Sequence, residues 1–256
     1  MTLAWILLQL LACAVVIAWA GYSLSRSADR LAEIYGWGRG WVGLAMLATI
    51  TSLPELASGI SSVTVVQAPN LAVGNALGAC VFNLLFLVVV DMVQRREPLY
   101  RHASDTHVLS AAFGVVMLGF VALGLLVGEL LADVLYIGVF SPPLLCLYLL
   151  ALRSVHQHER RLLEGLDGIA LPPETPRAER MQTWRNFVFS ATTVLLAGSA
   201  LPWVVDALSA HVGLSRSFAG TVLMALVTTL PEISVTLAAL RMGALDMALG
   251  NLLGSN

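Results

Sequence analysis

The chain has 256 residues, of which 58% are hydrophobic and only 12% are charged, and its mean hydropathy is +0.82. A soluble domain carries roughly 25% charged residues, so this composition argues against an ordinary soluble protein and indicates that lipid is the main solvent. The formal net charge of −2 gives no reason to expect a nucleic-acid partner. The cysteines lie far apart within apolar runs, and we expect free thiols rather than a disulfide or metal set at Cys13, Cys80 and Cys146.

Apolar runs long enough to cross a bilayer recur along the chain, because about 20 residues of helix span a hydrocarbon core of about 30 Å. The first run is interpreted as an uncleaved transmembrane helix. A cleaved secretory signal is the alternative, disfavoured because no basic residue precedes the run and its apolar stretch is longer than a usual signal core. The last run is too short to cross, so we expect the chain to end inside a helix. The expected spans are 3–23, 41–66, 71–93, 107–128, 130–152, 186–208, 218–240 and 244–256.

The basic residues, all arginines, predict how these spans are oriented. Every arginine except Arg216 falls in a loop on one side of the membrane if each span crosses once. The positive-inside rule makes that side cytoplasmic and places the N-terminus outside. The longest polar stretch, 153–185, is then a cytoplasmic linker between two halves. A regulatory calcium-binding domain is the alternative, disfavoured because the stretch has no dense acidic cluster.

Two sequence motifs occur twice. Thr-Ser-Leu-Pro-Glu at 51–55 recurs as Thr-Thr-Leu-Pro-Glu at 228–232, and Gly-Asn-Ala-Leu-Gly-Ala-Cys at 74–80 recurs as Gly-Asn-Leu-Leu-Gly-Ser-Asn at 250–256. The separations are 177 and 176 residues, so the motifs repeat as one unit. An odd number of spans lies between the copies, which predicts that they cross the membrane in opposite directions. Inverted repeats of this kind are typical of secondary transporters, whose ion site lies near the midplane at the repeat interface.

Each motif places a carboxylate in the middle of an apolar run, at Glu55 and at Glu232. A charge at that depth costs several kcal/mol unless something compensates it. Each glutamate follows a proline, Pro54 or Pro231, which lacks an N–H and frees a carbonyl one turn back. Hard cations such as Na⁺ and Ca²⁺ prefer such oxygen ligands. A glutamate that snorkels from a helix end is the alternative, disfavoured because apolar sequence continues on both sides.

The spacing of other polar residues favours a shared site. Thr51 lies four residues before Glu55, and Thr228 lies four residues before Glu232, so each pair shares a helix face. Glycines four residues apart on the next helix would let helices approach closely. Residues four apart form a second stripe on that helix in each copy, namely Asn75, Ala79 and Asn83 in the first and Asn251 and Ser255 in the second. For Asn75 and Asn251, helix packing alone is the alternative to ion binding.

These motifs resemble those of the cation/calcium exchanger superfamily, and in particular its prokaryotic sodium/calcium exchanger-like proteins, whose two α-repeats carry TSLPE and GN-xx-GSN-xx-N/D motifs. The match is close over about 45–85 and 222–256. The resemblance implies an all-α, polytopic membrane helix bundle with two inverted-topology repeats, the second incomplete. The first five-helix half would be 1–152, the cytoplasmic linker 153–185 and the partial second half 186–256.

The same resemblance implies a function and a set of site residues. The protein would be a secondary active antiporter of a prokaryotic inner membrane, exchanging Ca²⁺ for Na⁺ or H⁺ by alternating access, with no cofactor other than the transported ions. Glu55 and Glu232 would bind Ca²⁺ at the midplane in competition with Na⁺ or H⁺. Further oxygen ligands would come from Thr51, Ser52, Asn83, Thr228, Thr229 and Ser255, and the asparagines Asn75 and Asn251 complete the candidate set.

The sequence departs from the family pattern at several positions. Ala79 stands where the motif has serine, although its counterpart Ser255 keeps the hydroxyl, which puts one peripheral ion site in doubt. Ile50 and Val227 replace the glycines that usually precede the threonines. The chain ends at Asn256, before the last asparagine or aspartate of the second motif.

A cation channel and a non-transporting membrane scaffold are the alternatives to an antiporter. Single-channel currents would identify a channel, and the absence of Ca²⁺ binding would identify a scaffold. A membrane-embedded enzyme with Glu55 as its base is disfavoured, because no Ser/His, Cys/His or phosphate-binding motif accompanies the carboxylates.

Overall fold

The structure, a computed structural model, describes residues 2–35, 48–93, 105–127, 138–164, 176–241 and 245–256. Within these ranges every element is helical, which confirms the expected all-α class. The elements are α1 (Leu3–Tyr35), α3 (Ala48–Thr51), α4 (Leu53–Thr64), α5 (Pro69–Val93), α6 (Asp105–Val127), α7 (Ser141–Glu164), α8 (Arg177–Val212), α9 (Arg216–Phe218), the π-helix η4 (Ala219–Met224), α10 (Ala225–Thr228), α11 (Leu230–Arg241) and α12 (Leu245–Gly254).

Four of the described helices are long and apolar enough to cross a membrane, namely α1, α5, α6 and α8. The segments Arg216–Thr228 and Leu230–Arg241 form a fifth if this bent pair is one span, and α7 holds a shorter apolar helix, Ser141–Val155. The protein is therefore an integral membrane protein. The expected spans 41–66 and 130–152 begin with residues that lie outside the described ranges.

The two longest helices extend beyond the spans expected from hydropathy. α1 continues past residue 23 to Tyr35, and α8 begins at Arg177 rather than at residue 186. Both extensions contain arginine, alanine and glutamate, residues that favour a helix whether or not they are apolar. The expected linker 153–185 is accordingly helical at both of its ends, and 165–175 lies outside the described residues.

The chain divides into two compact units, one of residues 1–99 with 171–256 and one of residues 100–170. We call the first the core unit, because it contains both repeats. In the second unit α6 packs against α7, and the rings of Phe120 and Phe140 meet edge to face with their centroids 5.3 Å apart.

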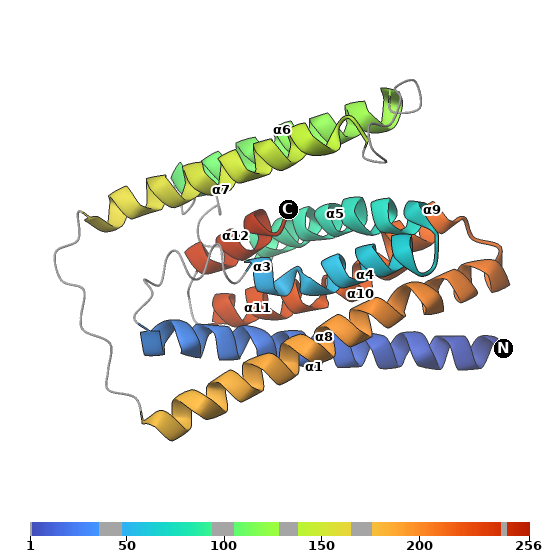
Figure 1. The fold of residues 1–256 in the computed structure, drawn as a ribbon, viewed down its shortest axis with the longest axis horizontal. Helices are drawn as coiled ribbons and strands as arrows, with labels where there is room; N and C mark the ends of the chain where they lie inside the picture. Colours follow the sequence, from blue (N-terminus) through green and yellow to red (C-terminus); the bar gives the residue numbers. More distant parts are fainter. Residues whose placement is uncertain (1, 36–47, 94–104, 128–137, 165–175, 242–244) are drawn as a thin grey trace. The chain divides into compact units, whose positions relative to one another are not determined.

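Helices of the two halves cross-pack within the core unit. α1 lies along α8, α1 also packs against α11, and α8 packs against α4. Apolar side chains from both halves, including Ile17, Leu201 and Met224, bury one another between these helices. α1 runs opposite to α8, α4 opposite to α11, and α5 opposite to α12 (Figure 1). The expected inverted repeat is therefore confirmed.

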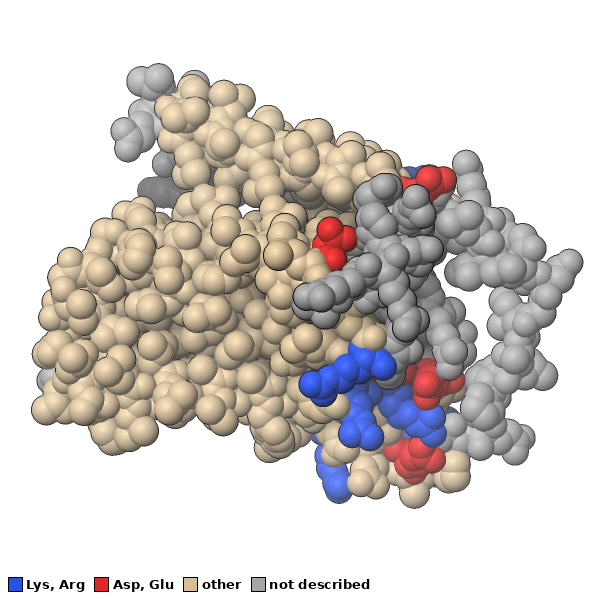
Figure 2. Space-filling model, turned by 180° about the vertical axis from the view of Figure 1, so that it is seen from behind, with Lys and Arg blue, Asp and Glu red and all other residues tan. Residues whose placement is uncertain are grey.

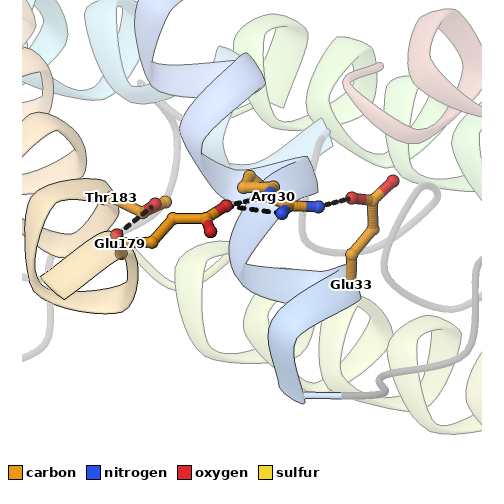
Figure 3. A network of polar contacts seen from close by, with 4 residues as sticks. All are labelled: Arg30, Glu33, Glu179 and Thr183. Carbon is orange, nitrogen blue, oxygen red and sulfur yellow. Dashed lines mark hydrogen bonds and ion pairs between the residues drawn. The ribbon is translucent and has the colours of Figure 1, made fainter. Parts of the chain in front are cut away.

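Polar groups lie at both ends of the core unit. Charged side chains gather on the visible face where α1 ends and α8 begins (Figure 2). There Arg30 of α1 donates to Glu33 Oε2 at 2.7 Å and, through Nε, to Glu179 Oε1 of α8 at 3.1 Å (Figure 3). At the other end of α8, Arg216 donates to Asp206 at 2.7 Å. These exposed ion pairs stabilise the fold little, but they delimit an apolar middle that suits a bilayer.

Candidate ion-binding site

Each Leu-Pro-Glu motif lies at a break in its helix. α3 ends at Thr51 and α4 begins at Leu53, and α10 ends at Thr228 while α11 begins at Leu230. The segments on either side of the second break are bent by 42°. The proline that follows each break has no N–H to continue the helical hydrogen bonds. Both breaks therefore follow from the local sequence.

Threonine hydroxyls satisfy carbonyls just before each break. Thr51 Oγ1 donates to Ala48 O at 3.1 Å, and Thr228 Oγ1 donates to Ala225 O at 3.3 Å. The hydroxyl of Thr229 also donates to Ala225 O, at 2.9 Å. Thr229 is fully buried but has no hydrogen bond to another candidate site residue among those described.

The two glutamates come together from the two repeats. Glu232 is 1% exposed, and its Oε1 accepts a hydrogen bond from Ser52 Oγ of the other repeat at 3.4 Å. Glu55 lies beside Thr228 of the other repeat. The carboxyl groups are close enough for their charges to interact, which places like charges near each other within the apolar bundle.

Three carboxyl oxygens of this pair are buried without a hydrogen-bond partner in the described part of the chain: Glu55 Oε1, Glu55 Oε2 and Glu232 Oε2. Buried polar atoms in proteins are nearly always paired, and an unpaired buried charge is very costly. The pair therefore needs a cation or protons to be stable in its apolar surroundings.

Asparagines tie the two repeats together reciprocally. The hydroxyl proton of Thr228 is shared between Ala225 O and Asn75 Oδ1, which lies 3.1 Å from Oγ1. That of Thr51 is shared between Ala48 O and Asn251 Oδ1, which lies 3.4 Å away. Each asparagine also donates through its amide nitrogen: Asn75 Nδ2 to Ser58 Oγ at 3.0 Å, and Asn251 Nδ2 to Thr236 Oγ1 at 3.1 Å. Asn75 and Asn251 thus have protein partners for both ends of their amides, as expected of residues that hold the repeats together.

Two residues of this network, Ser58 and Thr236, are absent from the set expected from sequence. Ser58 lies three residues after Glu55, and Thr236 lies four residues after Glu232. Both therefore share a helix face with the glutamate, a signal that the sequence carries.

The remaining candidates lie where α5 meets α12. Asn83 Nδ2 donates to Ser255 Oγ at 3.2 Å, and Ser255 Oγ donates to Asn251 O at 2.8 Å. Asn83 Oδ1 is buried without a partner among the described residues. Ala79 is buried on the same helix and supplies no hydroxyl.

The donor set is made of oxygen. The described residues contain no group of three or more histidine, cysteine, aspartate or glutamate side chains that could hold a metal. Carboxylate, amide and hydroxyl oxygens remain, and this is the chemistry that Ca²⁺ and other hard cations select.

Comparison with known proteins gives a consistent result. A family model described as sodium/calcium exchanger protein matches residues 5–152 and 184–256. The putative antiporter CaxA of Alkalimonas amylolytica is 27% identical over an alignment of 265 positions, which covers 94% of this chain and 73% of the relative. The inner membrane protein YrbG of Escherichia coli is 27% identical over an alignment of 226 positions, which covers 84% of this chain but only 64% of the relative.

Solved structures of the sodium-calcium exchanger NCX_Mj share the fold. One, soaked with Na⁺ and Sr²⁺, has a TM-score of 0.60 at 20% identity, over 99% of this chain and 78% of that chain. Another, soaked with Na⁺ without Ca²⁺, has a TM-score of 0.55 at 22% identity, over 99% and 79%.

Proposed function

Because the chain belongs to the sodium/calcium exchanger protein family, whose members are transporters and not enzymes, we propose that it exchanges Ca²⁺ for Na⁺ or H⁺ by alternating access. The observation that carries the proposal is the pair Glu55 and Glu232, which come from antiparallel halves and have three buried carboxyl oxygens without a hydrogen-bond partner among the described residues. The name of one relative, putative antiporter CaxA, supports the same reaction type. The ions are substrates, so no separate cofactor is needed.

The charge of the pair accounts for exchange between ions. Two carboxylates in an apolar bundle repel each other strongly, because charges interact more strongly there than in water. One Ca²⁺, two monovalent cations or protons would each neutralise them. Since these occupants satisfy the same two charges, the binding of one kind displaces the other, which is the requirement for antiport.

Other oxygens of the site extend the proposed ligand set. Asn83 Oδ1 is included as a neutral oxygen ligand, because it is buried and has no protein partner among the described residues. The hydroxyls of Thr51, Ser52 and Thr228 contact the glutamates or lie beside them. Thr229 and Ser255 belong to the set by motif position. Because Ala79 is the counterpart of Ser255, the first repeat has one hydroxyl fewer than the second.

The proposed orientation follows from charge. We place the protein in a prokaryotic inner membrane with its N-terminus outside. Residues 153–185 link the halves 1–152 and 186–256 and lie in the cytoplasm. The gathering of charged side chains where α1 ends and α8 begins (Figure 2) supports this choice, since arginines favour the cytoplasmic side.

The proposal is tested by ⁴⁵Ca²⁺ uptake into liposomes that contain the purified protein. We expect uptake to rise at least about tenfold when an outward Na⁺ or H⁺ gradient is imposed, because coupling to the gradient drives an otherwise uphill flux. Glu55→Gln should abolish this uptake, since it leaves one charge for a divalent ion. Glu179→Gln serves as the control, because this glutamate is exposed at the end of the core unit, and exchange should persist.

Other outcomes identify the alternatives. Ca²⁺ flux that ignores the gradient and is unchanged in Glu55→Gln would contradict antiport at this site. Single-channel currents in planar bilayers would indicate a channel. A protein that binds no ⁴⁵Ca²⁺ at millimolar concentration would be a scaffold.

A further inference from the structure

Two glycines outside the repeat motifs occupy equivalent positions in the two halves. Gly21 lies in α1 and Gly198 lies in α8. Their separation is 177 residues, the same as that between Glu55 and Glu232. Both glycines are buried, and neither belongs to a repeat motif.

Each glycine lies against the proline of the opposite half. A Cβ at Gly21 would overlap the ring of Pro231. A Cβ at Gly198 would lie 3.1 Å from Pro54 O and 3.1 Å from Ala57 Cβ. The contacts are therefore reciprocal, in that α1 of the first half meets the second motif and α8 of the second half meets the first.

Both prolines are bonded directly to the site glutamates. A shift of Pro231 carries Glu232 with it, and Glu232 reaches Ser52 of the other repeat through a hydrogen bond already 3.4 Å long. A shift of Pro54 likewise moves Glu55. Misplacing a binding group by a fraction of an ångström weakens its interactions steeply, so the room left by each glycine controls where the opposite carboxylate lies.

We propose that Gly21 and Gly198 are positioning residues for cation binding, each allowing the long helix of one half to set the place of the glutamate in the other half. This inference rests on the proposed function, because it concerns the affinity of the same site. It does not assign either glycine a contact with the ion.

The test compares Gly21→Ala and Gly198→Ala with Gly59→Ala. Gly59 lies on α4 of the same unit, and a Cβ there meets no atom within 4 Å. The readouts are the Kd for ⁴⁵Ca²⁺ of the purified protein, the KM and turnover of exchange in liposomes, and the midpoint of thermal unfolding in detergent.

We expect Gly21→Ala to raise the Kd and the KM for Ca²⁺ at least about tenfold, because its Cβ overlaps the proline ring. Gly198→Ala should raise both by about threefold, because its contacts are tight without overlap. Gly59→Ala should match the wild type. If Gly21→Ala does not fold, the milder Gly198→Ala carries the test, with a raised Kd at an unchanged unfolding midpoint as the supporting result.

Two results separate the inference from the proposed function. A wild-type protein that exchanges Ca²⁺, with glycine variants whose Kd and KM equal those of Gly59→Ala, would overturn the inference alone. A wild-type protein that neither binds nor exchanges Ca²⁺ would overturn the proposed function and the inference with it.

Discussion

At the residue scale, the bond between Thr228 and Asn75 joins the two repeats inside the bundle. The hydroxyl donates to Asn75 Oδ1 at 3.1 Å, and both side chains are buried. Because both side chains are buried in a largely apolar interior, this bond contributes more to stability than an exposed one would.

Thr228→Val keeps the shape of the side chain and removes the donor. We expect the free energy of unfolding to fall by about 1–3 kcal/mol, because Asn75 Oδ1 is left buried and unpaired. Thermal unfolding in detergent measures this as a lower midpoint. Thr192→Val is the control, since that exposed hydroxyl donates only to Val188 O of its own helix, and a change of less than about 0.5 kcal/mol is expected. Equal midpoints for the two variants would refute the assigned role.

At the element scale, the break between α10 and α11 affects both the stability of the helix and the position of Glu232. Pro231 is the second residue of α11; its missing N–H interrupts the helical hydrogen bonds between α10 and α11, and Glu232 follows it directly. The segments are bent by 42° at this break, and Glu232 accepts a hydrogen bond from Ser52 of the other repeat. The break is therefore a feature of the site rather than of general stability.

Pro231→Ala should separate these two effects. The alanine restores an N–H, so we expect a higher unfolding midpoint, while Ca²⁺ exchange falls at least about tenfold because the straighter helix moves Glu232. Pro202→Ala in α8 is the matched control, since Pro202 also lies inside a helix but outside the site, and exchange should persist. Undiminished exchange in Pro231→Ala would show that the bend is dispensable.

At the scale of the whole molecule, the inverted repeat predicts which turns reach each side of the membrane. Gln67 is exposed in the turn between α4 and α5, with a backbone φ of 54°. Arg180 is exposed near the start of α8. The proposed topology places the first outside and the second in the cytoplasm.

Cysteine labelling of intact cells tests this topology. In a background with Cys13, Cys80 and Cys146 replaced by alanine, a membrane-impermeant maleimide should label Gln67→Cys, whereas Arg180→Cys should react only after lysis. The bilayer is the barrier in both cases, so the two variants control each other. Labelling with the opposite pattern would invert the proposed orientation, and labelling of both in intact cells would contradict the membrane crossing between them.

Much of the fold and of the site was accessible from sequence, because its signals are local. Apolar runs marked the membrane helices, since lipid selects for them over about 20 residues. The separation of 177 residues between Glu55 and Glu232, with an odd number of spans between, implied antiparallel copies. The helix breaks followed from Pro54 and Pro231. Helix ends were less accessible, because α1 continues to Tyr35 through polar residues that hydropathy assigns to a loop.

What the sequence by itself determined is the kind of protein and the residue types at its centre, since composition, repeat and proline chemistry act over short stretches of chain. Only the tertiary structure decided which groups meet: Thr228 with Asn75, Ser52 with Glu232, and Gly21 with Pro231. These contacts join residues far apart along the chain. They depend on how closely two helices approach. The packing of many side chains sets that distance, so no single sequence motif predicts it.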